Sequence, residues 1–469
     1  MQLSTRKTLD RSFTGMGIFS ILLMAAALLV LLVPIVVRGM GAFVFRATVE
    51  HRRFILEHFG RGDRPEVEAE LAEIRRARQP VYDALAAFKK QLVLMSQKDL
   101  LALPIARRDE YKWADSAKIA KALRSNLEQT EQYVKQLLGP LPGEPAPVMP
   151  RDRYGETRWD RSLVTLDRIL YRETYDYSDP TKMGVLVRVP RAELFEGTEL
   201  APLFPYAENH LAELMHPRWT FYWRFVTDVP VDASMFGGIW PMLLGTIYLT
   251  IGAMVFAVPM GVVTAIYLVE YAPSRSRLVS VLRVFISTLA GVPSIVFGLF
   301  GLAFFIYKLH VSDSPSVLAG SLTLAVLVLP TVIRASEEAL RAVPLAYKEA
   351  ALSLGASKWR TVVTVILPAA LPGVLTGIII SMGRAAGETA PIIFTAAVSI
   401  GRPLKLWEVF SEPTPALPWN IYNLCSEHQA IEEIRHVQYG MVLVLVALVL
   451  LLNVTAILLR ARISRKLRG

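Results

Sequence analysis

Six long, predominantly apolar stretches alternate with polar segments along the chain. Each is long enough for a helix across the hydrocarbon core of a bilayer, which takes about 20 residues. The predicted spans are Gly15–Val37, Gly237–Val269, Val284–Tyr307, Pro315–Ile333, Gly373–Val398 and Val437–Leu459. The first stretch is too long for the apolar region of a secretion signal, and no small-residue cleavage pattern follows it. We therefore expect an all-α polytopic membrane protein with six transmembrane helices.

A long segment, residues 40–236, separates the first two predicted spans. Within it, Pro65–Met95 and Ala114–Leu138 carry apolar residues at the spacing of amphipathic helices, which would pack their apolar stripes together. Leu163–Tyr177 and Met183–Val189 alternate between apolar and polar residues and favour short strands. The segment is thus predicted to be an α+β insertion, either a sensing or docking module or a simple appendage.

The scattered histidines of this insertion predict surface positions and no metal site. They are His51, His58, His210 and His216. The predicted organisation has three parts: an N-terminal tail with the first helix (1–39), the insertion (40–236), and a membrane core (237–469).

Basic residues cluster beside the ends of the spans. If the spans alternate, these clusters share one side: Arg6, Lys7 and Arg11; Arg275, Arg277 and Arg283; the stretch from Arg334 to Arg360; and Arg460, Arg462, Arg465, Lys466 and Arg468. Basic loops stay in the cytoplasm, so we expect both termini there and the insertion outside. The net charge of +10 is explained by this orientation rather than by nucleic-acid binding. The single cysteine, Cys425, excludes an intrachain disulfide.

A motif with regular spacing occupies the loop between the fourth and fifth spans, at about 334–372. It reads Glu349-Ala350-Ala351, three residues, Gly355, nine residues, and Val365-Ile366-Leu367-Pro368. The two alanines let another surface approach closely, the glycine permits a sharp turn, and the proline is expected to end the following helix. This pattern predicts a rigid helix-turn-helix that can transmit force, with Glu349 facing a basic or helix-end partner.

The fifth predicted span carries a cation and a carboxylate, Arg384 and Glu388, near its middle. Charges within a bilayer normally face a partner or an aqueous pathway. The two residues are four apart and share one helix face, so we expect them to pair. Gly383 and Gly387 offer a surface for close helix packing. A forked guanidinium suits an oxyanion, which makes Arg384 a candidate contact for a translocated anion, with Glu388 holding it and Arg334 as a second contact at the inner mouth. A purely structural ion pair is the alternative.

These motifs resemble a known family, the PstA-type permeases of the bacterial phosphate-specific ABC importer. The resemblance covers about 235–465 and rests on the Glu-Ala-Ala loop, Gly291–Gly298, Leu329–Arg334 and Gly387–Ala396, with Val365 replacing the usual isoleucine. It implies a type I importer permease fold in a bacterial inner membrane, with Arg334, Arg384 and Glu388 matching charged residues used in transport. The large insertion departs from the shortest family members.

The resemblance also implies partners. It predicts a PstC-like second permease, a PstB-like ATPase dimer that docks on the Glu-Ala-Ala loop, and an extracytoplasmic phosphate-binding protein, with membrane lipids around the spans. The sequence contains no Gly-x4-Gly-Lys-Ser/Thr phosphate-binding loop, so we expect no cofactor in this chain and ATP-Mg in the partner ATPase. A permease for sulfate, molybdate or phosphonate, and a membrane-anchored sensor, are the alternatives.

Overall fold

The structure, a computed structural model, describes residues 3–107, 115–176, 184–273 and 276–468. It divides into two compact units, one formed by Met1–Ala42 and Trp223–Gly469 and the other by Phe43–Tyr222. Four residues named in the sequence predictions, Ala114, Tyr177, Met183 and Arg275, lie outside the described residues.

The first unit, which we call the membrane unit, is built almost entirely from helices. Its helices are α1 (Leu3–Met40), α10 (Trp240–Ile266), α11 (Arg277–Leu289), α12 (Ser294–Gly301), α13 (Val317–Arg341), α14 (Leu345–Ser353), α15 (Lys358–Thr361), α16 (Leu367–Gly387), α17 (Ala390–Thr395), α18 (Leu417–Ser426) and α19 (Arg435–Arg468). Wider π-helical turns follow α10 (Tyr267–Tyr271), α12 (Leu302–Lys308) and α15 (Val362–Ile366). Short 3-10 turns lie at Trp223–Val226 and Glu408–Phe410, and β5 (Pro230–Val231) pairs with β6 (Phe236–Gly237).

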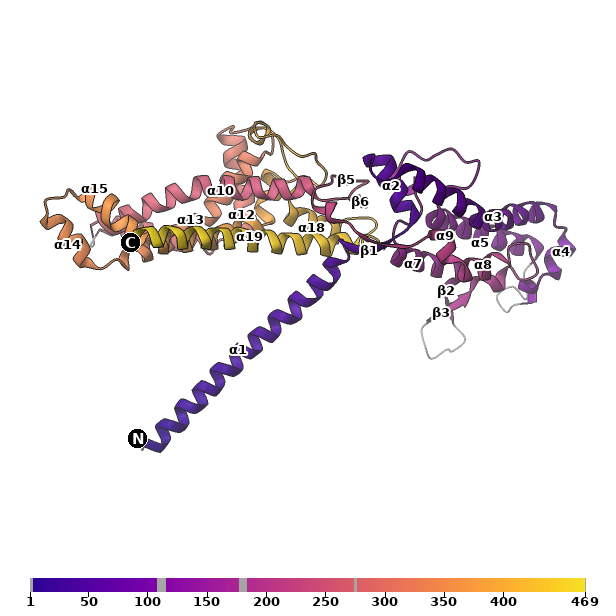
Figure 1. Ribbon diagram of the computed structural model, residues 1–469, viewed down its shortest axis with the longest axis horizontal. Coiled ribbons are helices and arrows are strands. Elements are labelled where there is room, and N and C mark those ends of the chain that lie inside the picture. Colours follow the sequence, from indigo (N-terminus) through magenta and orange to yellow (C-terminus); the bar gives the residue numbers. More distant parts are fainter. Residues whose placement is uncertain (1–2, 108–114, 177–183, 274–275, 469) are drawn as a thin grey trace. The chain divides into compact units, whose positions relative to one another are not determined.

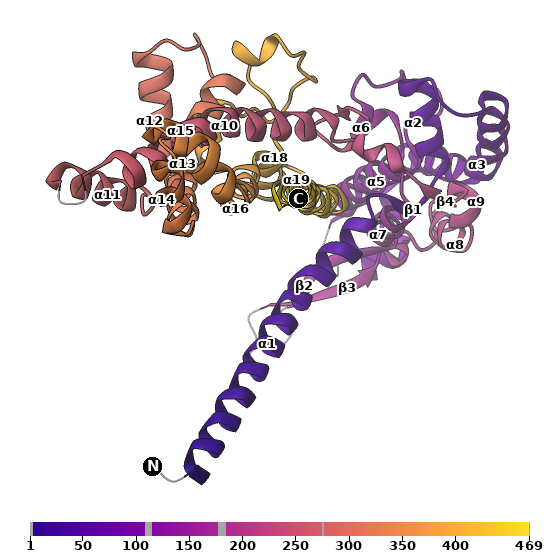
Figure 2. The ribbon, with the colours of Figure 1, turned by 60° about the vertical axis from the view of Figure 1, so that its left-hand side comes forward.

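Five helical segments in the described part of the chain are long and apolar enough to cross a membrane, or six if one bent helix pair counts as a span. Four of them pack in the order α10, α13, α16 and α19. Figure 1 labels α10, α13 and α19 of this group, and Figure 2 labels α16 as well. The apolar window of α1 is not buried at all, whereas two thirds of the window in α13 is. The membrane unit therefore has a helical core around α13 and a first helix whose apolar surface is left for lipid.

The third predicted span is not one continuous helix. The segment Val284–Tyr307 is divided between α11 and α12, which are bent by 104° relative to each other. The break contains Gly291 and Pro293, and Pro293 has the extended ψ of 139°. Proline cannot continue the hydrogen bonds of a preceding helix and restricts the residue before it, which explains the bend.

Helices α13 and α16 approach each other through small residues. A Cβ atom at Gly373 would lie 2.6 Å from the Cβ of Ala339, and one at Gly377 would lie 2.3 Å from that of Ala335. Both pairs follow a small-xxx-small spacing, which brings membrane helices into close contact. The sequence predicted close helix packing at Gly383 and Gly387 instead. That prediction is wrong for Gly387, where a Cβ atom would meet nothing within 4 Å.

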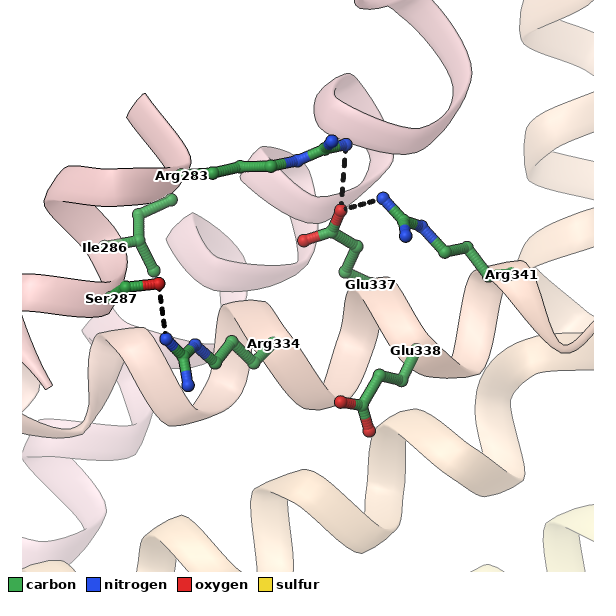
Figure 3. A pocket seen from close by; sticks show the side chains of 7 residues that line it. All are labelled: Arg283, Ile286, Ser287, Arg334, Glu337, Glu338 and Arg341. Carbon is green, nitrogen blue, oxygen red and sulfur yellow. Dashed lines mark hydrogen bonds and ion pairs between the residues drawn. The ribbon is translucent and has the colours of Figure 1, made fainter. Parts of the chain in front are cut away.

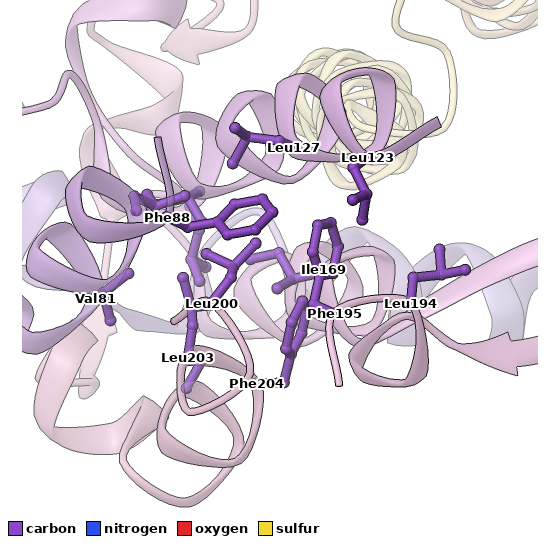
Figure 4. Close-up of a cluster of buried hydrophobic side chains, with 14 of the residues drawn as sticks. Val81, Phe88, Leu123, Leu127, Ile169, Leu194, Phe195, Leu200, Leu203 and Phe204 are labelled. Carbon is purple, nitrogen blue, oxygen red and sulfur yellow. The ribbon is translucent and has the colours of Figure 1, made fainter. Parts of the chain in front are cut away.

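The second unit, which we call the insertion unit, surrounds one hydrophobic core (Figure 4). Its elements are β1 (Val44–Ala47), α2 (Val49–Phe59), α3 (Arg64–Leu94), α4 (Gln97–Ala102), a 3-10 turn (Pro104–Arg107), α5 (Ser116–Leu138), α6 (Pro150–Arg153), α7 (Trp159–Leu170), β2 (Tyr171–Asp176), β3 (Val185–Pro190), a 3-10 turn (Arg191–Leu194), α8 (Leu203–Asn209), α9 (Leu211–Met215) and β4 (Arg218–Phe221). The two predicted amphipathic helices are α3 and α5, and their stripes join this core through Phe88 and Leu123. The predicted first strand is wrong over Leu163–Leu170, which is helical, and correct over Tyr171–Asp176, where β2 pairs with β3.

The prediction of a surface histidine is wrong for His51. Its ring is 9% exposed and makes edge-on contacts with Phe45 and Tyr222, with ring centroids 5.2 and 5.6 Å away. Burial, together with the charges of Arg158 and Arg52, lowers the pKa of His51 to about 3. This histidine is therefore a neutral packing residue of the insertion unit.

Candidate functional site

The Glu-Ala-Ala loop forms the predicted helix-turn-helix from α14 and α15. Gly355 has a φ of +80°, the left-handed conformation that glycine adopts without strain, and its N–H donates to the carbonyl of Leu352. Ser357 then caps α15 by accepting a hydrogen bond from the N–H of Arg360. Glu349 and Ala350 are exposed on the resulting hairpin. The loop thus presents a compact helical surface with a fixed turn.

Two details of the predicted loop are wrong. Ala351 is only 9% exposed, so it packs inward and leaves Ala350 as the small residue on the surface. Pro368 does not end a helix, because Lys358–Gly387 is one helical run through α15 and α16. The π-helical turn at Val362–Ile366 lies just before this proline, and the Leu367 N–H bonds to the carbonyl of Val362, five residues back. The wider turn makes room for the proline ring, which would clash within a regular helix.

An ion pair that the sequence did not reveal ties this loop to the second span. Lys348 of α14 places its Nζ atom 2.5 Å from Oε2 of Glu270, in the π-helical turn that ends the α10 segment. The Glu270 side chain is only 5% exposed and that of Lys348 is 29% exposed. Nearby, the Nζ atom of Lys358 lies 4.9 Å from the ring centre of Tyr271. The hairpin is therefore joined to the end of the α10 segment by an ion pair whose carboxylate is buried. Lys348 and Glu270 are 78 positions apart in the sequence, so no local pattern could have revealed their pairing.

The predicted pairing of Arg384 with Glu388 is present, with Nε of the arginine 3.2 Å from Oε1 of the glutamate. The pair does not lie at the middle of a continuous span, however. Helix α16 ends at Gly387, Glu388 is its C-cap residue with a ψ of 131°, and a separate helix α17 begins at Ala390. Pro391 has no N–H to offer the last turn of α16, which explains the break. The carboxylate therefore lies at a helix end beside irregular backbone, as in many transporter binding sites.

Helix α12 packs closely against the start of α17, just after the break that ends α16. A Cβ atom at Gly298 of α12 would lie 3.0 Å from the carbonyl oxygen of Ala390 and 3.1 Å from the Cα of Pro391. A glycine is thus required at 298 for the close approach of α12 to α17. The sequence motifs Gly291–Gly298 and Gly387–Ala396 are therefore one packed substructure beside Arg384 and Glu388.

Arg334 lies in a different place, in a cavity of about 310 Å³ between α11 and α13 (Figure 3). The lining residues are Arg283, Ile286, Ser287, Arg334, Glu337, Glu338 and Arg341. Helix α13 continues to Arg341, so Arg334 is two turns inside the helix and not at its end as predicted. Its Nη2 atom donates to the hydroxyl of Ser287, 2.5 Å away.

Glu337 in this cavity forms ion pairs with the other two arginines, Arg283 and Arg341. Its Oε1 atom lies 3.0 Å from Nη2 of Arg283 and 2.5 Å from Nη2 of Arg341. Arg334 lines the same cavity, and the single negative charge of Glu337 is shared between Arg283 and Arg341. Arg384 and Glu388 are not among the lining residues, so the three predicted pathway residues form two separate sites. Within the described residues, no group of three His, Cys, Asp or Glu side chains could hold a metal ion.

Comparison with known proteins gives consistent matches to transport permeases. Residues 257–469 match the family described as "Binding-protein-dependent transport system inner membrane component". A probable ABC transporter permease protein of Bacillus subtilis, YqgI, is 34% identical over 253 residues, which cover 52% of this chain and 85% of the relative. The phosphate transport system permease protein PstA 1 of Mycobacterium tuberculosis is 38% identical over 232 residues, covering 50% and 72%. The corresponding PstA of Yersinia pestis is 35% identical over 233 residues, covering 50% and 75%.

Among solved structures, a chain of the MetNI methionine ABC transporter in an inward-facing conformation aligns with a TM-score of 0.37. The two sequences are 19% identical, and the alignment covers 48% of this chain and 94% of the other.

Proposed function

This chain belongs to the family of binding-protein-dependent transport system inner membrane components, and we propose that it is the PstA-type permease subunit of an ATP-driven phosphate importer. The observation that carries the substrate proposal is the Arg384–Glu388 pair at the break between α16 and α17. Relatives named as phosphate transport permeases match half of this chain at 35–38% identity. A guanidinium held inside a transport protein suits an oxyanion rather than a neutral or cationic substrate.

The geometry of the pair supports transient binding of an anion. Glu388 engages the Nε atom of Arg384, which leaves the two terminal nitrogens to form a fork toward a phosphate oxygen pair. The carboxylate also lowers the local positive potential, so the anion is bound without being trapped. The side chain of Arg384 is 39% exposed, as a residue that meets a passing substrate must be.

Arg334 is proposed as a second contact on the inner side. The cavity of about 310 Å³ around it has room for a hydrated oxyanion, and Ser287 beside it can donate a further hydrogen bond. Because Glu337 partly neutralises the other arginines, this site is expected to hold the anion weakly before release.

Coupling to ATP is proposed to run through the α14–α15 hairpin. Glu349, Ala350 and Gly355 shape its surface, and Ala351 packs inward. Leu367 and Pro368 begin α16, through which the hairpin continues into the span. Exposed apolar side chains extend the surface: Leu345, Tyr347, Leu352, Leu354 and Trp359. An apolar helical surface of this kind is what a partner groove would cover. We propose that a PstB-like ATPase dimer, which binds ATP-Mg, docks there, and that this chain itself has no nucleotide site.

The remaining assembly follows from the same proposal. A PstC-like second permease completes the pathway, and an extracytoplasmic phosphate-binding protein delivers the substrate. The chain resides in a bacterial inner membrane with both termini in the cytoplasm, because its basic segments flank the spans on that side.

Uptake of labelled phosphate by membrane vesicles that contain this chain and its partners tests the proposal. Arg384→Gln should abolish uptake while the complex still assembles, and full uptake by that variant would refute the role of the arginine. Arg53→Gln is a matched control, because Arg53 makes the same Nε–Oε1 ion pair with a glutamate four residues on, at 2.8 Å in the insertion unit. That control should transport normally.

Competition experiments decide which oxyanion is carried. A guanidinium does not by itself distinguish phosphate from sulfate, molybdate or phosphonate, so excess unlabelled anions are added to the wild-type vesicles. Inhibition by arsenate but not by sulfate supports phosphate. Inhibition by sulfate but not by arsenate would overturn the substrate proposal and leave the permease assignment intact.

A further inference from the structure

Strands β1 and β4 of the insertion unit form a two-stranded antiparallel ribbon with one apolar, exposed face. Val44 pairs with Phe221, and Arg46 pairs with Trp219. Directly opposed residues of antiparallel strands share a face, so these four side chains project together. Val44, Trp219 and Phe221 are 41%, 74% and 65% exposed. We call this surface, made of Val44, Arg46, Trp219 and Phe221, the ribbon face.

The opposite face of the ribbon is fixed to the insertion unit. Phe45 is 7% exposed and Ala47 is fully buried. The Cζ atom of Arg158 lies 4.2 Å from the ring centre of Phe45, and the ring of His51 contacts Phe45 edge-on. The ribbon is therefore held by its back, and the exposure of its front is a property of the folded unit.

The covalent chain ties this ribbon to the membrane surface. Val44 follows Met40, the last residue of α1, by four residues, which span at most about 14 Å when fully extended. None of the apolar window of α1 is buried, as expected of a helix surrounded by lipid, and Met40 and Val44 are 42% and 41% exposed. Trp223, 52% exposed, lies two residues after Phe221, and Trp240 begins the next span.

We propose that the ribbon face is an interfacial anchor that lies in the headgroup region of the membrane leaflet at which α1 ends. Tryptophan concentrates at this depth because its ring is apolar and its N–H still reaches water or headgroups. Arg46 is exposed on the same face, where it can meet lipid phosphates. The insertion unit would then rest on the bilayer, which restricts the orientations available to it.

This inference depends on α1 crossing the membrane and not on which anion is transported. It is tested with full-length protein in lipid nanodiscs, in a Cys425→Ser background, with a nitroxide label at Trp219→Cys or, in a second variant, at Phe221→Cys. Val148→Cys is the matched control, because Val148 is an apolar residue of the same unit that is 96% exposed. Power-saturation spectroscopy compares collisions of each label with lipid-soluble oxygen and with a water-soluble nickel chelate.

The labels at 219 and 221 are expected to collide more with oxygen than with the nickel chelate, and the label at 148 is expected to show the reverse. If the ribbon labels behave like the label at 148, the face is solvated and the inference is wrong. If the ribbon labels are shielded from both reagents, the face is covered by protein and the lipid anchor is also refuted. Agreement between the two ribbon variants excludes local misfolding at one of them.

Discussion

The ion pair between Lys348 and Glu270 offers the sharpest test of how the hairpin is connected to the membrane helices. Its two partners are buried to different degrees, with 29% and 5% of their side chains exposed. Replacing Lys348 with methionine leaves a buried carboxylate without its cation, which costs about 3–5 kcal/mol. Replacing Glu270 with glutamine leaves a lysine that can turn to water, which costs only about 1 kcal/mol.

The double variant Lys348→Met/Glu270→Gln should be more stable than Lys348→Met alone, because it removes the unpaired charge as well as the pair. Thermal inactivation of the complex in nanodiscs gives the ranking of stabilities. The ratio of phosphate transported to ATP hydrolysed reports coupling, and we expect it to fall in both single variants. Independent, additive effects of the two changes, or a larger loss in Glu270→Gln than in Lys348→Met, would show that this pair does not connect the hairpin to α10.

Three further changes probe the fold. Gly355→Ala forces a side chain into the left-handed conformation (φ +80°), so it should destabilise the hairpin by about 1 kcal/mol and reduce coupled transport, whereas unchanged transport would contradict the assigned turn. Gly377→Leu should separate α16 from α13, because even a Cβ atom would lie 2.3 Å from that of Ala335. The melting temperature should drop clearly, unlike that of Gly387→Ala, where the site is open. With a pKa of about 3, His51 stays neutral in the folded protein, whereas in the unfolded chain its imidazole gains a proton below pH 6.5. The contribution of His51 to stability is therefore full above pH 6.5, and the free energy of unfolding should fall by up to ~1.4 kcal/mol per pH unit from there towards pH 3. Chemical unfolding at several pH values measures this slope, which His51→Leu should remove.

Features encoded within one or two helical turns could be predicted from the sequence. Hydropathy located the membrane helices, because the cost of leaving apolar residues in water depends on composition over about 20 residues. The turn at Gly355 followed from the conformational freedom of glycine, and the contact between Arg384 and Glu388 followed from their spacing on a helix. Each of these depends on neighbours along the chain.

Contacts between distant segments required the tertiary structure. The sequence placed Glu388 within a helix, whereas the packing of Gly298 against Ala390 and Pro391 accompanies a broken one. It also gave no sign that Lys348 would meet Glu270. The pattern of apolar and charged residues shows which helix faces are buried and which charges need a partner. Many different segments could bury the same face or pair with the same charge, so the actual contact is set only by how the helices pack. The sequence by itself therefore determined a multi-span permease with a helical hairpin at the Glu-Ala-Ala motif, and the tertiary structure decided where its helices break and how the hairpin is joined to them.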